Sequence, residues 1–448
     1  MMLLSFLLYL VYLPFSGCLV LPYDAAAYWD LAAQFSDHRH FSLLHYANGL
    51  RGYLYPLLLF GPWALQHTVA SWATPLLCAQ MLGAGWAGLL FGLAIPQLWA
   101  QATGRPLTAG RWLMLLSLAF VFWRDHFNFT LSDVPALTLL LLGLGALGRS
   151  GRGWGLAAGA LIAASINTRP IYIACVPGVL ALLAINRRSV GWWCRCVGLV
   201  VGSTLVLLPQ GLVNWRYFQQ ATPLVLAHLP GRPPLYLRQL GWGTSFQRFE
   251  ASLLPAHPAA LVYADPSGQQ ALAAEPGRQF ADYGHYLRFV ACQPLSVGLR
   301  YGRHLFNGLD LWHATPYVMQ LHPIGQDLLR LLNYLLWGVS LGQIGCTCWH
   351  KRQVAVSIQA RAVLLAVLLP CALSLPTLIE CRFLLPLHLL LLASIAATAH
   401  PRAWWDAVGS AGRRGAVVAF VAGWLWGCWQ VSENTAQQLR PSNERPHL

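Results

Sequence analysis

Residues 196 to 213 read CVGLVVGSTLVLLPQGLV, a continuous stretch without a charged residue. Arg195 precedes this stretch, and Asn214, Trp215 and Arg216 follow it. A helix needs about 20 predominantly apolar residues to cross the hydrocarbon core of a bilayer. Aromatic and basic residues are typical of the boundaries of such a helix. The stretch therefore predicts a membrane-spanning helix.

Comparable apolar runs recur along nearly the whole chain. Of the 448 residues, 56% are hydrophobic and 10% are charged, whereas a soluble domain has about 25% charged residues. So few charges could not cover a surface that faces water. We therefore expect an all-α polytopic membrane protein with about 11 transmembrane helices, in a range of roughly 10 to 12. The spans are placed at residues 3–21, 76–100, 112–124, 134–148, 155–167, 171–186, 196–213, 328–348, 362–379, 383–399 and 415–430.

These spans divide the chain into four parts. Residues 1–213 form an N-terminal transmembrane module, and its first outer loop covers 22–75. Within that loop, residues 54–68 are apolar but interrupted by proline, which predicts a re-entrant or interfacial helix. Residues 214–327 form a large extracytoplasmic loop of mixed, mainly helical structure. Residues 328–430 hold the C-terminal transmembrane helices, and 431–448 form a polar tail.

The basic residues predict how the chain is oriented in the membrane. With a cytoplasmic N-terminus, every short inner loop carries arginine or lysine, as the positive-inside rule expects. The net charge of +14 is therefore explained by topology, and we expect no nucleic-acid partner. Under the same orientation, 14 of the 15 acidic residues lie outside, and only Asp406 lies inside. Any chemistry that needs carboxylates is thus expected on the outer face of a plasma (inner) membrane.

Several segments place polar residues at that outer face. Asp24 and Tyr28 are four residues apart in the first outer loop and would share one side of a helix. Each segment also has a plain structural interpretation, such as a helix cap, a lipid-headgroup anchor or a structural ion pair. Together they predict one pocket of acids and arginines. The candidate residues are Asp24, Tyr28, Asp133, Arg169, Asn214, Arg216, Glu380 and Arg382.

The order of these motifs resembles the GT-C class of membrane glycosyltransferases, in particular the branch of protein O-mannosyltransferases and aminoarabinose transferases. The resemblance covers residues 1 to about 400 in order, through short and degenerate motifs. Many members have two adjacent acids in the first outer loop, whereas Ala25 follows Asp24 here. The similar elements are Asp24-xxx-Tyr28-xxx-Ala32, Tyr55-Pro56, Ser132-Asp133-Val-Pro-Ala, Thr168-Arg169, Pro209-xxxx-Asn214-Trp-Arg216, Tyr286 to Pro294 and Glu380-Cys-Arg382-Phe.

The resemblance implies an inverting glycosyltransferase that uses a sugar donor linked to a polyprenyl phosphate. Asp24 would be the catalytic base, and Arg169 and Arg382 would bind the donor phosphate. The acceptor would be a hydroxyl group of a lipid, a glycan or a protein. We predict no metal ligands, although the resemblance leaves a divalent cation open. The supporting or acceptor-binding residues would be Tyr28, Asp133, Asn214, Arg216 and Glu380.

Three other functions fit the same composition, the third being a non-catalytic membrane scaffold, which would not need acids and arginines on one side of the membrane. A polysaccharide polymerase is another membrane enzyme with a large loop that transfers glycosyl groups. A transporter or flippase of lipid-linked sugars would place polar residues near the bilayer midplane and would carry a repeat, and the sequence contains no clear repeat. Three histidines of the large loop lack the geometry of a metal site and are interpreted as ordinary loop residues; they are His304, His313 and His322.

Overall fold

The computed structural model describes residues 1–12, 15–37, 40–69, 72–149, 151–188, 191–228, 231–255, 257–320, 322–350, 357–398 and 411–440. The chain forms two compact units. The first contains Met1–Leu107, Arg124–Tyr236 and Val356–Leu373. The second contains Thr108–Trp123, Leu237–Ala355 and Ser374–Leu448. The large loop predicted at 214–327 therefore contributes to both units.

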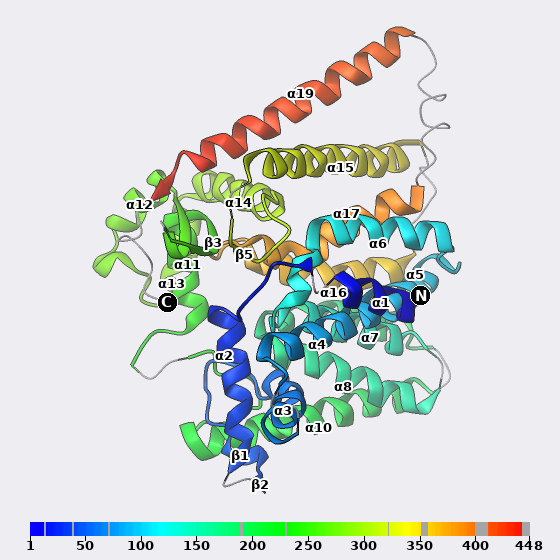
Figure 1. Cartoon of the computed structure of the whole chain (residues 1–448), viewed down its shortest axis with the longest axis vertical. Helices are drawn as coiled ribbons and strands as arrows, with labels where there is room; N and C mark the ends of the chain where they lie inside the picture. Colours follow the sequence, from blue (N-terminus) through cyan, green and yellow to red (C-terminus); the bar gives the residue numbers. More distant parts are fainter. Residues whose placement is uncertain are drawn as a thin grey trace. The chain divides into compact units, whose positions relative to one another are not determined.

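The first unit is mainly helical (Figure 1). Among its described residues, strands β1 and β2, of two residues each, pair as a short antiparallel hairpin. Its elements are α1 (Met2–Tyr12), α2 (Tyr23–Ala32), η2 (Ala33–Phe35), β1 (Ser36–Asp37), β2 (His40–Phe41), η3 (Leu43–His45), α3 (Leu54–Thr68), α4 (Pro75–Leu89), η4 (Leu90–Ala94), α5 (Ile95–Thr103), η5 (Arg124–Asn128), α7 (Asp133–Leu147), α8 (Arg152–Thr168), η6 (Pro170–Cys175), α9 (Val176–Ile185), α10 (Trp192–Phe218) and most of α16 (Ile358–Ser374).

Helix α7 is buried along almost its whole length. It packs against α4, α5 and α8, and its sequence is apolar on all sides, as a helix at the centre of a bundle requires. Helices α8 and α10 lie against each other over a long contact. A Cβ atom added to Gly202 of α10 would lie 2.1 Å from the carbonyl oxygen of Leu156 in α8. Glycine therefore sets how closely these two backbones approach.

The second unit combines helices with a small sheet (Figure 1). Helix α11 begins at its boundary with the first unit. Its elements are α6 (Ala109–Trp123), α11 (Leu235–Ser245), β3 (Phe246–Leu254), β4 (His257–Ala264), α12 (Pro266–Ala273), η7 (Pro276–Arg278), α13 (Tyr283–Cys292), α14 (Pro294–Leu309), β5 (Tyr317–Val318), α15 (Pro323–His350), η8 (Cys381–Leu384), α17 (Leu385–Thr398), α19 (Ala411–Ala436) and β6 (Leu439–Arg440).

The sheet has the strand order β5-β3-β4-β6. Strands β3 and β4 form an antiparallel hairpin, and β5 pairs with β3 in parallel. Strand β6 follows α19 and pairs with β4, so Leu439 lies opposite Tyr263. Figure 1 shows α19, in orange to red, running into the red strand beside the green hairpin. The expected mixed structure of the large loop is thus present, and part of the predicted polar tail belongs to its sheet.

The prediction of about eleven membrane spans is wrong for the described residues. Three helical stretches are long and apolar enough to cross a membrane, Pro75–Thr103, Trp192–Phe218 and Gly415–Ala436. A fourth would arise if Ala109–Asn128 and Asp133–Leu147, bent by 119°, formed one broken span. Other apolar runs fold into helices that are too short, because 11 residues of α1 rise only about 16 Å at 1.5 Å per residue. The core of a bilayer is about 30 Å thick.

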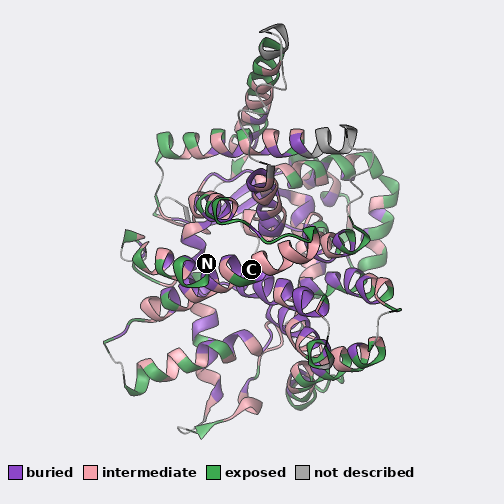
Figure 2. Ribbon diagram, turned by 90° about the vertical axis from the view of Figure 1, so that its right-hand side faces the viewer, coloured by how far each residue is buried: buried purple, intermediate pink, exposed green. Residues whose placement is uncertain are grey.

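The candidate spans differ in how far they are covered by protein. Each stretch can be compared by its most apolar 18 residues. In Pro75–Thr103, 50% of them are buried. In Trp192–Phe218 the buried share is 17%, and in Gly415–Ala436 it is 11%. Figure 2 shows long helices that carry green, exposed residues along one side. Apolar side chains of the last two stretches thus face outward rather than into a core.

Candidate active site

Asp24 lies in the first turn of α2, where the helix dipole favours a negative charge. Its Oδ1 atom is 2.6 Å from Nη2 of Arg51, and 43% of the Asp24 side chain remains exposed. The Arg51 guanidinium also lies 4.2 Å from the ring centroid of Tyr28. Burial alone lowers the pKa of Arg51, but Tyr28 and Asp24 outweigh this effect and raise it. Asp24 is therefore a carboxylate that stays accessible while a fixed cation orients it.

The loop before α3 holds Arg51 in place through its own backbone. Oδ1 of Asn48 accepts hydrogen bonds from the backbone N–H groups of Leu50, at 2.9 Å, and Arg51, at 2.8 Å. The buried Tyr46 hydroxyl donates to the carbonyl oxygens of Arg51 and Gly52, at 3.0 and 3.1 Å. These contacts fix the backbone from which the Arg51 side chain reaches Asp24, so Arg51 loses little further freedom in forming the pair.

Asp133 and Arg169 form a second ion pair in the same unit. Asp133 begins α7 and is buried, whereas Arg169 directly follows α8. The side chains of Arg169 and Asp133 are 17% and 6% exposed. A charge buried this far is stable only with a partner. Two of the residues that the sequence proposed for one pocket thus form an ion pair with each other.

Backbone contacts bring the two ion pairs into one region. Thr130, three residues before Asp133, donates its hydroxyl to the carbonyl oxygen of Ala25 at 2.6 Å. A Cβ atom on Gly52 would lie 1.9 Å from the carbonyl oxygen of Asn167, so only glycine fits there. The side chain of Asn167, two residues before Arg169, accepts a hydrogen bond from the backbone of Leu54 at 2.9 Å. The neighbours of Asp24 and Arg51 therefore contact the neighbours of Asp133 and Arg169.

A small cavity lies next to this region. It has a volume of about 10 Å³, and its lining includes Tyr55, His126, Leu131 and Pro135. The ring of Tyr55 packs edge-on against Tyr28, with 5.1 Å between the centroids. A volume of this size is about that of one water molecule. This cavity therefore has no room for a sugar.

Asn214 and Arg216 are placed differently from the two ion pairs. Asn214 is fully buried, and its amide nitrogen donates to the carbonyl oxygens of Thr222 and Leu224, both at 2.7 Å. Both amide protons are thus used to join the end of α10 to the loop that follows. Arg216 is exposed and lies 5.4 Å from the ring centroid of Tyr217. Of this predicted pair, Arg216 alone keeps its polar head open to a ligand.

Glu380 and Arg382 form a third ion pair, in the second unit. Nε of Arg382 lies 2.6 Å from Oε2 of Glu380, and Nη2 donates to Oε1 at 3.1 Å. Both side chains are 14% exposed. This two-point geometry is the strong form of an arginine–carboxylate contact. The two residues belong to a different unit from Asp24, so their meeting with Asp24 stays a prediction.

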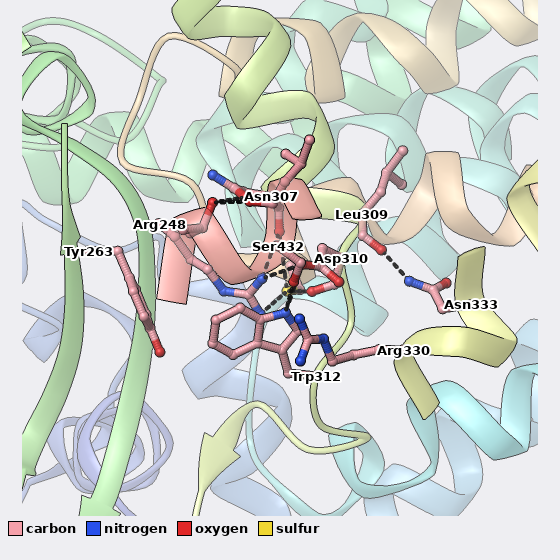
Figure 3. Close-up of polar contacts among 12 residues, drawn as sticks. Arg248, Tyr263, Asn307, Leu309, Asp310, Trp312, Arg330, Asn333 and Ser432 are labelled. Carbon is pink, nitrogen blue, oxygen red and sulfur yellow. Dashed lines mark hydrogen bonds and ion pairs between the residues drawn. The ribbon is translucent and has the colours of Figure 1, made fainter. Parts of the chain in front are cut away.

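The second unit also contains a buried network that the sequence did not predict (Figure 3). Arg248 of β3 is fully buried, lies 2.5 Å from Glu250 and 3.4 Å from Asp310, and covers the ring of Trp312 at 3.9 Å. Burial by itself would raise the pKa of Glu250, but Arg248 lowers it below its usual value. Asp310 also accepts hydrogen bonds from Trp312 at 2.7 Å and Tyr334 at 2.8 Å.

This network joins β3, α15 and α19. It extends to α19 through the Ser432 hydroxyl, which donates to Asp310, and through Glu433, which lies 2.9 Å from Arg330 of α15. Opposite charges are matched within it, and Arg248 and Asp310 have no exposed surface. A closed set of this kind stabilises a fold and offers no open position to a substrate.

A metal site is not evident in the part of the chain that the structure describes, because no three His, Cys, Asp or Glu residues come together there in a group that could hold an ion. Comparison of the chain with family models, curated proteins and solved structures gave no match.

Proposed function

We propose that the chain is an integral membrane glycosyltransferase of the GT-C type. It would move a sugar from a polyprenyl-phosphate donor to an acceptor hydroxyl on the outer face of the plasma (inner) membrane. The observation that carries this proposal is the exposed Asp24 carboxylate, which Arg51 holds at 2.6 Å. The neighbouring Asp133–Arg169 pair adds the second cation that a phosphate-linked donor would need.

In the proposed reaction, Asp24 accepts the proton of the acceptor hydroxyl. The hydroxyl oxygen then forms a bond to the anomeric carbon, with inversion at that carbon. The bond between this carbon and the phosphate oxygen breaks, and its electron pair leaves with the lipid phosphate. A phosphate is a good leaving group, so no general acid is needed. Arg51 favours the charged form of Asp24, which a base requires.

The phosphate would be bound by guanidinium groups. Arg169 is partly exposed beside the region of Asp24, and Arg382 is predicted to approach from the second unit. Their planar donors match the geometry of a phosphate. Arg51 is a further donor of the same type, already next to the base. The acceptor would contact Tyr28 or Arg216, and it would be a lipid, a glycan or a protein.

The membrane location is supported by the three apolar helices and by the outward-facing apolar side chains of two of them. In the proposed orientation the N-terminus is cytoplasmic and the start of α2 faces the exterior, so α1 and the segment between it and α2 would have to cross the membrane together, because α1 alone is too short. The shorter apolar helices, such as Ile358–Ser374, would lie within the bilayer against the longer ones. The lipid carrier of the donor would then approach Asp24 along the surface of the protein.

The test of this function is a donor assay with two matched aspartate variants. Purified protein is incubated in lipid vesicles with several polyprenyl-phosphate sugars, and the donor that is consumed is identified. Asp24→Asn should lower the rate by about 100- to 10,000-fold, the usual contribution of a general base. Asp30→Asn is the control, because Asp30 is exposed on the same helix and should keep its rate within about twofold.

Arg51 provides a second variant for the same assay. Arg51→Gln should lower the rate by about tenfold or more, since Asp24 loses its orienting partner. Arg51→Lys should retain more of the rate than Arg51→Gln, because lysine keeps the charge but not the planar guanidinium group. Near-normal turnover by Asp24→Asn would exclude Asp24 as the base. Movement of an unchanged donor across the bilayer would instead identify a transporter.

A further inference from the structure

Helices α13 and α14 turn large apolar side chains away from the protein. Tyr283 and Leu287 of α13 are 45% and 64% exposed, and Leu295 and Leu299 of α14 are 77% and 62% exposed. In each helix the two residues are four positions apart, so they lie on one side of it. We call these four residues the α13–α14 stripe. Gly298 and Gly302 are also exposed beside the stripe, and a Cβ atom on either would meet nothing within 4 Å.

The opposite side of α14 is polar and buried, which fixes the rotation of the helix. Nε of Arg300 lies 3.2 Å from Asp265, and Nδ1 of His304 donates to the carbonyl oxygen of Leu375 at 2.6 Å. The amide of Asn307 donates to the carbonyl oxygen of Gln247 at 3.0 Å. A helix on a surface that faces water would have its polar side outward. These inward contacts instead hold the leucines of the stripe outward.

The charged residues within α13 and α14 are all arginines, although Asp282 caps α13 next to Tyr283 and Arg303 also lies 3.2 Å from the buried Asp265. Helix α14 contains no aspartate or glutamate, and the side chain of Arg303 is 39% exposed. Arg288 is exposed next to Leu287 in α13. Apolar residues flanked by arginine are typical of helices that lie in the interface of a membrane, with the arginines among anionic headgroups. The same unit also contains α19, whose stretch Gly415–Ala436 is long and apolar enough to span a bilayer.

The geometry points to a membrane-docking surface: the α13–α14 stripe lies in the headgroup region of the outer leaflet, with Arg288 and Arg303 against anionic lipids. This inference rests on the membrane location in the proposed function, but not on glycosyl transfer. It would place residues 237–327, the part of the large loop that belongs to the second unit, directly on the lipid surface. A lipid-linked substrate would then enter beside the loop rather than through water.

Photolabelling of the unmodified full-length protein tests this surface. The protein is reconstituted in vesicles of phosphatidylethanolamine and phosphatidylglycerol that contain a phospholipid with a diazirine near its headgroup. After irradiation and tryptic digestion, labelled peptides are quantified. Cleavage after arginine gives peptides 279–288 and 289–300 from the stripe, 249–278 from the hairpin and α12, and 196–216 from α10. We expect the two stripe peptides to be labelled at least about fivefold more than peptide 249–278.

Peptide 196–216 distinguishes the two possible failures. If it is labelled while peptide 289–300 is labelled no more than 249–278, then water or protein covers the stripe and the inference is overturned. If 196–216 is also unlabelled, the membrane location fails, and the inference fails with it. A variant with Leu295→Asn and Leu299→Asn should lose at least about two thirds of the labelling of 289–300. Both residues are exposed, so the fold should tolerate the change, and unchanged labelling would contradict the assignment.

Discussion

At the scale of single residues, His304 illustrates how burial sets the charge of a side chain. It is fully buried in α14, and burial lowers its pKa to about 4. Its Nδ1–H group donates to the carbonyl oxygen of Leu375, which suits a neutral ring. Asp265 is close enough to favour the charged form and Arg300 to oppose it, but both effects are smaller than that of burial. The histidine interpreted as an ordinary loop residue is thus part of the core.

This pKa shift predicts a dependence of stability on pH. The folded state holds His304 neutral down to about pH 4, whereas in the unfolded chain it takes up a proton near pH 6.5. The unfolded state therefore binds more protons between these values, and stability falls as the pH is lowered through them. The loss should be on the order of 3 kcal/mol at pH 4. Unfolding midpoints in detergent at pH 7 and pH 4 measure this loss.

Two variants separate His304 from the other titrating groups. His304→Asn keeps an amide donor for Leu375 but cannot take up the proton, so its midpoint should change less between the two pH values. His322→Asn is the control, because His322 is exposed and should leave the pH dependence as it is. An equal pH dependence in His304→Asn and the parent protein would show that His304 does not cause it.

At the scale of secondary-structure elements, the contact between α8 and α10 depends on residues without side chains. Gly159 of α8 and Gly202 of α10 each face backbone of the other helix, at 2.1 Å from an added Cβ atom to the carbonyl oxygens of Leu199 and Leu156. A side chain at either position would therefore force the two helices apart. Since α8 ends just before Arg169, a displacement here would also disturb the Asp133–Arg169 pair.

Gly202→Ala should therefore destabilise the protein by about 1 to 3 kcal/mol, the usual effect of overpacking. Gly211→Ala, in the same helix, should have little effect or a slightly positive one, because its added methyl group would be 3.6 Å from the nearest atom, in Pro223. Thermal unfolding in detergent, followed by size-exclusion chromatography, compares the two. A lower midpoint for Gly211→Ala than for Gly202→Ala would contradict the packing described for α8 and α10.

At the scale of the whole molecule, apolar runs predicted where helices lie but not how long they are. The run at 196–213 corresponds to the long α10, whereas the run predicted as one helix at 3–21 gives α1, which ends at Tyr12. Hydropathy does not report where a helix stops. The Asp24–Arg51 pair joins residues 27 apart in sequence, through a loop that has no periodic pattern. Asp133 and Arg169 could each be predicted as candidates because both lie at helix ends, but the sequence did not predict that they pair with each other.

The orientation of the chain in the membrane gives a prediction at this same scale. Cys194 is exposed near the basic segment before α10, which is proposed to lie inside, and Gln270 is exposed in α12 of the large loop. In intact cells, a membrane-impermeant maleimide should modify Gln270→Cys. It should modify Cys194 only after the membrane is permeabilised. The labelled tryptic peptides, 249–278 and 189–195, report the two sites separately, and the reverse pattern would invert the proposed topology.

Strand β6 has a consequence for biosynthesis. It follows α19, yet it forms the outer strand next to β4, about 180 residues earlier in the chain. The ribosome must therefore complete α19 before residues 439–440 can reach the hairpin. Until then β4 has an unpaired edge, which is a site where chains can associate wrongly. A pause late in translation would prolong that exposure, whereas an early pause would not.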